Sequence, residues 1–187
     1  NQTSSNAGIS VKPGSYQDAS GNLGLGTSSP SLSVDTTLPK LISTEITSAK
    51  DGLASLSNPN IQWLNSGDTL FISAFFSEAV FLNLSNGVPT LELLIGTQLV
   101  NASYVSGSES KVLIFSTRVT NGQTDTDGVS ISINALRLNG ATVSDVAGNQ
   151  SSITSIEVMN NPNFLVDTKL PEVLITSDVS ALKANET

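Results

Sequence analysis

Residues 69–76 read Thr-Leu-Phe-Ile-Ser-Ala-Phe-Phe, and every second position of this stretch carries an apolar side chain that we expect to face a core. The same alternation recurs at residues 111–119 and at residues 129–133. A period of two is typical of a β-strand with one buried face, because successive side chains point to opposite sides of a sheet. The positions predicted to be buried are Leu70, Ile72, Ala74, Phe76, Leu113, Phe115, Val119, Val129, Ile131 and Ile133.

Turn-forming pairs separate these stretches. Residues 86–87, 121–122 and 139–140 are all Asn-Gly, a pair that favours tight turns between strands. No stretch shows the period of about 3.6 residues that marks an amphipathic helix. We expect about seven or eight strands in the central part of the chain, a number that favours a Greek-key sandwich of immunoglobulin type. The expected fold class is all-β, with immunoglobulin-like Greek-key β-sandwich modules in tandem.

The chain also resembles itself. Residues 8–39 and residues 128–171 both begin with Gly and a strand-like stretch, continue through Asp-x-(Ser/Ala)-Gly-Asn and end in Val-Asp-Thr-x-Leu-Pro. Self-similarity at one period predicts a tandem-repeat protein. The matched pairs are Asp18 with Asp145, 127 residues further on, and Asp35 with Asp167 and Pro39 with Pro171, each 132 residues further on.

This period divides the chain into three parts. We expect residues 1–36 to be the C-terminal part of one module, residues 37–168 to be a complete module, and residues 169–187 to be the start of a following one. The chain is then a piece of a longer array, cut out of register with its modules. A module of this size can bury roughly two-thirds of its unfolded surface, so it needs no disulfide to fold.

Composition excludes several classes of function. The chain carries 16 acidic and 8 basic residues, for a formal charge of −8, so we expect no binding to nucleic acid or to an anionic membrane surface. It has no Cys and no His, which excludes metal sites and catalytic triads built on these residues. No apolar run is long enough to insert in a membrane. We therefore expect that the protein is not an enzyme.

Acidic residues gather where a sandwich of immunoglobulin type would bring its loops together. The loops at residues 76–79 and 145–149 should return to the end where the chain enters, called here the entry pole. The loop at residues 123–128 and the outgoing linker should meet at the opposite end, the exit pole. The expected entry-pole residues are Asp35, Glu78, Asp145 and Asn149, and the expected exit-pole residues are Asp125, Asp127 and Asp167.

Carboxylates packed this closely repel one another unless a cation lies among them. Ca2+ accepts irregular cages of oxygen ligands, so it is the favoured ion, with Mg2+ as second choice. Each motif also has an ordinary structural interpretation, because Asp-Thr-Asp-Gly at residues 125–128 and Asp-Val-Ala-Gly-Asn at residues 145–149 both suit simple turns. The first is not an EF-hand, since the twelfth position from Asp125 is Leu136 rather than Glu. Adjacent carboxylates on one turn also cannot flank a glycosidic bond.

Three motifs together resemble a known family. Residues 76–80 (Phe-Ser-Glu-Ala-Val), residues 145–149 and residues 166–168 (Val-Asp-Thr) are similar to the bacterial immunoglobulin-like repeats of giant biofilm adhesins, many of which are exported by type I secretion. Residues 177–186 resemble the opening of another such repeat. The resemblance implies extracellular spacer modules that hold a distal binding region away from the bacterial cell. It also implies calcium at the junctions between neighbouring modules of the same chain, with Asp35 and Asp167 as linker ligands.

Two further expectations follow. The first junction has Ser4 and Asn6 where the central module has Asp125 and its neighbours, so we expect the Asp167 junction to respond to calcium more strongly than the Asp35 junction. The alternative function is a ligand-binding module of the same adhesin, for glycan or a surface, for which Trp63 is the candidate residue. An anchor in the core or at its rim is the favoured role for Trp63. Residues 49–66 have no assignment.

Overall fold

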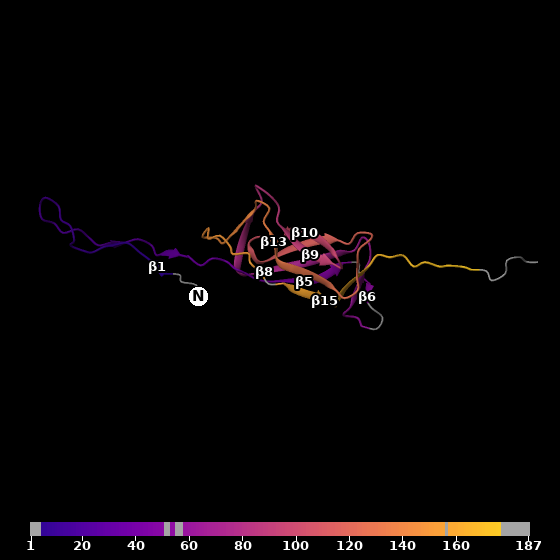
Figure 1. The fold of residues 1–187 in the computed structure, drawn as a ribbon. Helices are drawn as coiled ribbons and strands as arrows, with labels where there is room; N and C mark the ends of the chain where they lie inside the picture. The colour runs from indigo at the N-terminus through magenta and orange to yellow at the C-terminus, as the bar shows by residue number, and fades with distance from the viewer. Residues whose placement is uncertain (1–4, 51–52, 55–57, 156, 177–187) are drawn as a thin grey trace, which may run out of the picture.

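The computed structural model describes residues 5–50, 53–54, 58–155 and 157–176, and within these ranges the chain contains β-strands and no helix (Figure 1). The stretch at residues 177–186 lies outside the described residues. The described part of the chain has no helix of the length and apolarity needed to cross a bilayer. The all-β prediction is confirmed, and the strands build a sandwich whose larger sheet curves toward a barrel.

The larger sheet has the strand order β14-β8-β11-β10-β9-β13-β15, with β5 also paired to β8. All the pairings in this sheet are antiparallel. A parallel bridge outside the named strands joins Lys40, which precedes β5, to Ser152, which lies between β14 and β15. The strands of the larger sheet are β5 (Leu41–Lys50), β8 (Thr69–Asn83), β9 (Thr90–Ile95), β10 (Gln98–Ser106), β11 (Ser110–Arg118), β13 (Val129–Arg137), β14 (Thr142–Ser144) and β15 (Val158–Asn161).

The smaller sheet has the order β12-β16-β7-β6 and shares one core with the larger sheet. Its last strand, β16, pairs antiparallel with β12 and parallel with β7. These strands are β6 (Leu53–Ala54), β7 (Gln62–Leu64), β12 (Thr124–Asp125) and β16 (Phe164–Asp167). Residues 49–66, unassigned from sequence, thus supply the end of β5 together with β6 and β7; residues 51–52 and 55–57 lie outside the described ranges.

The core lies between the two sheets and follows the predicted alternation closely. Phe115 is fully buried and packs edge-on against Tyr104, with ring centroids 5.9 Å apart. From the smaller sheet, Leu64, Phe164 and Val166 pack into the same cluster. Of the predicted inward positions, those that are buried are Leu70, Ile72, Ala74, Phe76, Leu113, Phe115, Val119, Val129 and Ile131.

Ile133 was wrongly predicted to be inward, because it is 63% exposed. The cause is a register shift in β13 between Ile131 and Leu136, where the backbone of Asn134 adopts a left-handed φ of 51°. Asn134 is held there by a pair of hydrogen bonds with the backbone of Ser155. Ile133 lies within this irregular stretch and so departs from the alternation that places Val129 and Ile131 in the core.

Residues 76–79 were expected to form a loop, and they instead lie inside the long strand β8. Phe75 pairs with Val112 and Val80 pairs with Ser110, so four residues of β8 oppose one residue of β11. The backbone N–H of Ser77 donates to the carbonyl of Lys40, which ties this bulge to the residue before β5. The bulge thus re-aims Glu78 without ending the strand.

Residues 5–34 form a narrow two-stranded arm that projects from one end of the sandwich (indigo in Figure 1). Residues 169–176 leave from the opposite end (yellow) and are exposed throughout. The strands of the arm are β1 (Ser5–Ala7), β2 (Ser10–Val11), β3 (Thr27–Ser28) and β4 (Leu32–Val34), with β1 paired to β4 and β2 paired to β3.

The loop at the tip of the arm, residues 18–22, has the same Asn-to-Asp hydrogen bonds as the loop at residues 145–149 of the sandwich. Asn22 donates from its backbone and side chain to the Asp18 carboxylate at 2.9 and 2.8 Å, and Asn149 donates to Asp145 at the same two distances. Bridges flank both loops at matching positions, Gln17 with Leu23 and Ser144 with Gln150.

The linkers match in the same way. The backbone N–H of Thr37 donates to Asp35 Oδ1 at 2.9 Å, and that of Lys169 donates to Asp167 Oδ1 at 2.9 Å. The strand before each linker is also paired alike, Ser5 with Val34 in the arm and Asp125 with Val166 in the sandwich.

Candidate metal centre at the entry pole

Three carboxylates from distant parts of the sequence meet at the entry pole. Asp35, Glu78 and Asp145 each place an oxygen within 4.8 Å of the others. They come from the entering linker, from the bulge in β8 and from the loop after β14. Three of the four residues predicted for this pole are therefore brought together, and the fourth, Asn149, contacts two of them.

The linker holds Asp35 in place through its own backbone. Asp35 Oδ1 accepts the N–H of Thr37 in a short Asx-turn, which fixes the direction of the side chain. Four residues after Asp35, the carbonyl of Pro39 accepts hydrogen bonds from the backbone of Ser152 at 2.9 Å and from the hydroxyl of Ser151 at 3.1 Å. The linker is thus bound to the sandwich at Pro39.

Glu78 is the member of the cluster whose charge is least well compensated. Partial burial raises the pKa of its carboxyl above the ordinary value, and the negative charges of Asp35 and Asp145 raise it further. Lys111 lowers this pKa in part, while its ammonium donates to the carbonyl of Ser77 at 3.2 Å. The cluster therefore repels the ionised form of Glu78 when no cation is bound, and a bound cation would remove this repulsion.

Asp145 is buried, and the turn that follows it stabilises its charge. Burial acts to raise the pKa of its carboxyl, but hydrogen bonds from the side chain of Asn149 and from the backbone of Asn149, Ala147 and Gly148 outweigh that effect, so the pKa is lowered. Gly148 has a φ of 90°, a left-handed conformation that glycine adopts without strain. The short loop thus presents an ionised carboxylate to the linker.

Asn149 connects the loop to the linker. Its side-chain amide nitrogen donates to Asp145 Oδ2 at 2.8 Å and to the backbone carbonyl of Asp35 at 3.1 Å. In this arrangement the residue acts as a donor between two cluster members, and its amide nitrogen cannot be a metal ligand. The sequence pattern predicted its position correctly and gave no signal of this bridging role.

The chemistry of the entry pole suits a hard divalent cation. Calcium takes about six to eight oxygen ligands in flexible geometry, and three carboxylates, neighbouring carbonyls and water can supply them. Magnesium demands a tighter octahedron and fewer protein ligands, so an open cluster drawn from three segments suits it less well. The donor set holds only oxygen, which is the ligand that both ions prefer.

The exit pole does not gather its predicted residues into a comparable cluster within the described ranges. Asp125 is buried, and both of its oxygens accept backbone N–H groups at 2.7 Å, from Gly128 and from Gly96. Asp125 is paired with Val166 and Thr124 with Asp167, so Asp125 and Asp167 point to opposite faces of the smaller sheet. Asp127 is exposed and accepts the side-chain amide of Asn160.

The role of Asp125 is therefore that of a turn residue, which was the alternative left open by the sequence. Asp167 has the same Asx-turn as Asp35 and is exposed.

Trp63 lies in β7 and is 37% exposed, so it is at the rim of the sandwich. Thr168, whose position is part of the repeated Val-Asp-Thr motif but to which the sequence assigned no role, is buried at the exit pole and hydrogen-bonded to residues 122 and 123.

Comparison of the chain with protein-family models, with curated proteins and with solved structures gives no match. Fold and site therefore define the class at a general level: an all-β sandwich protein with an acidic cluster where the chain enters.

Proposed function

We propose that the chain is a spacer segment of a secreted bacterial surface adhesin. Its modules would be immunoglobulin-like Greek-key sandwiches in tandem, divided at residues 36 and 168, and neighbouring modules of the chain would be its main partners. Calcium at the junctions would stiffen the array, which would project a distal binding region for cell adhesion or biofilm formation.

The observation that carries this proposal is the path of the chain through the sandwich. The chain enters at one end and leaves at the opposite end, and both linkers have the same Asx-turn at matching positions (Figure 1). A module with its two connections at opposite ends adds its full length to an array. The loop shared by the arm and the sandwich supports the same interpretation, because the arm then corresponds to the end of a preceding module.

The calcium part of the proposal is supported by the acidic cluster, whose three carboxylates include one from the linker itself. An ion bound by Asp35, Glu78 and Asp145 would tie the linker to the sandwich. Rigidity of a junction depends on such ties, since a linker with few contacts leaves adjacent domains free to move.

Small-angle scattering of the full chain tests the proposal. We expect the scattering to show an elongated monomer. When calcium replaces a chelator, the distribution of interatomic distances within the particle should narrow. We also expect no binding on a glycan array and no turnover with a hydrolase substrate panel. Glycan binding that is lost in Trp63→Ala would favour the ligand-binding alternative, and a compact particle that is indifferent to calcium would contradict the spacer proposal.

A further inference from the structure

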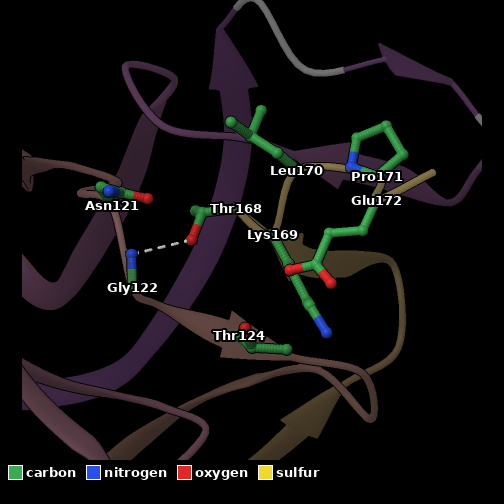
Figure 2. Close-up of a pocket in the computed structure, with 8 residues that line it drawn as sticks. All are labelled: Asn121, Gly122, Thr124, Thr168, Lys169, Leu170, Pro171 and Glu172. Carbon is green, nitrogen blue, oxygen red and sulfur yellow. Dashed lines mark hydrogen bonds between the residues drawn. The ribbon is translucent and has the colours of Figure 1, made fainter. Parts of the chain in front are cut away.

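The chain leaves the sandwich along an open groove of about 620 Å³ at the exit pole (Figure 2). One wall is the turn between β11 and β12, and the other is the departing chain itself. The next eight residues of the departing chain, 169–176, are exposed, but Thr168 is only 8% exposed. The groove is lined by Asn121, Gly122, Thr124, Thr168, Lys169, Leu170, Pro171 and Glu172.

The Thr168 hydroxyl satisfies two backbone groups of that turn. Its Oγ1 accepts the N–H of Gly122 at 2.9 Å, the bond drawn in Figure 2, and donates to the carbonyl of Gln123 at 2.8 Å. Both capacities of the hydroxyl are therefore used inside a buried contact. Loss of the hydroxyl would leave a carbonyl and an N–H without their partner.

The turn is shaped before Thr168 reaches it. Gln123 is 4% exposed, and its side-chain carbonyl accepts the N–H of Thr120 at 2.8 Å. Gly122 has a φ of 87°, which directs its N–H toward the departing chain at little cost. The contact thus joins a rigid turn to the first residue after β16.

We propose that Thr168 is a positioning residue that fixes the direction in which the chain leaves the sandwich, through a latch formed with Gly122 and Gln123 that needs no metal ion. The proposal rests on the spacer function only in that a spacer needs a defined exit direction. One residue before the latch, Asp167 is still paired with Thr124, and its carboxylate closes the turn with Lys169. Strand pairing therefore holds Asp167, the latch holds Thr168 and the Asx-turn holds Lys169. These three successive residues together fix the path of the linker.

Thr36 provides a matched comparison. It occupies the place of Thr168 in the first linker, and in the described structure it is exposed. The residue type and the neighbouring Asx-turn are the same, so a difference between substitutions at residues 36 and 168 isolates the contribution of the latch.

The experiment compares Thr168→Val, Thr168→Ala and Thr168→Ser with Thr36→Val in the full chain, in chelator. Backbone amide exchange at Gly122 and the heteronuclear NOE of Lys169 are the two readouts. We expect Thr168→Val and Thr168→Ala to raise exchange at Gly122 by about tenfold and to lower the NOE at Lys169 to the level of a free tail. Thr168→Ser should restore both values, and Thr36→Val should change neither.

Unchanged dynamics at Lys169 in both Thr168→Val and Thr168→Ala would overturn the proposal, and so would failure of Thr168→Ser to restore them. Thr168→Ala keeps the comparison valid if the buried methyl of valine disturbs the fold. Because every sample contains chelator, these outcomes are independent of whether calcium binds at the entry pole.

Discussion

Asn149 donates a hydrogen bond from its side-chain amide to the backbone carbonyl of Asp35, 114 positions earlier in the chain, at 3.1 Å. Together with the hydrogen bonds that Ser151 and Ser152 donate to the carbonyl of Pro39, this contact holds the entering linker on the sandwich. Because the acceptor is a main-chain carbonyl, the contact depends on Asn149 and on the path of the linker, and it is independent of the side chain at residue 35.

The first prediction concerns calcium. Asp145→Asn should weaken calcium binding by at least about tenfold, because it removes one of three carboxylates and affinity rises with ligand charge. Asp127→Asn is the control, since Asp127 lies at the exit pole and contacts Asn160 instead. Calorimetric titration of the full chain measures both. Equal affinities in the wild type and in Asp145→Asn would exclude the entry pole as the calcium site.

The second prediction concerns stability in calcium. Binding to the folded state alone adds about 3 kcal/mol at a hundredfold excess over Kd, which corresponds to a rise in melting temperature of about 5–10 °C. The rise should vanish in a Glu78→Gln/Asp145→Asn double variant and persist in Asp125→Asn, if that variant folds. Thermal unfolding with calcium and with chelator measures the difference. A rise of the same size in the double variant would place the ion elsewhere.

The third prediction concerns pH in the absence of metal. Glu78 has a raised pKa, so the folded state binds its proton more tightly than the unfolded state does. The free energy of unfolding therefore falls as the pH rises from the ordinary pKa of a glutamate to the raised pKa of Glu78. At lower pH the side chain is protonated in both the folded and the unfolded state, so this cost is absent. Asp145, whose pKa is lowered, contributes in the opposite sense: its stabilisation is present above its ordinary pKa and is lost below it.

Glu78→Gln in chelator should consequently raise the melting temperature at pH 7 by about 1–3 °C and leave it unchanged near pH 3. Glu45→Gln is the control, because Glu45 is exposed on β5 and shows no contact with the cluster. Equal effects of Glu78→Gln at both pH values would show that repulsion within the cluster is not the cause.

The fourth prediction concerns two glycines with left-handed backbones. A Cβ at Gly128 would collide with the backbone carbonyl of Asn161, whereas a Cβ at Gly122 meets nothing within 4 Å. Gly128→Ala should therefore cost about 2–5 kcal/mol, and Gly122→Ala about 1–2 kcal/mol from its φ alone. Urea unfolding measures both, and similar costs would mean that the close approach to Asn161 relaxes easily.

Alternation in the sequence predicted the fold class and most of the core, because burial on one face of a strand is a local property. It failed at Ile133 and at residues 76–79, since a bulge depends on the partner strand, and the sequence of one strand does not reveal it. The entry-pole residues were predicted from a repeated loop and a linker, and three of them meet. The three residues predicted for the exit pole do not come together. The register of the pairing between β12 and β16 places Asp125 and Asp167 on opposite faces of the smaller sheet.

The position of the two linkers also determines how the sandwich would carry tension. A pull on the entering and departing chains acts through β5, which is antiparallel to β8 over eight residue pairs, and through β16, which is parallel to β7. Since the chain enters and leaves at opposite ends, the force runs along these strands, and their hydrogen bonds are loaded in shear. Bonds loaded in this way must break together, whereas bonds peeled from one end break one at a time. The same geometry that lengthens an array would therefore make each sandwich resist mechanical unfolding.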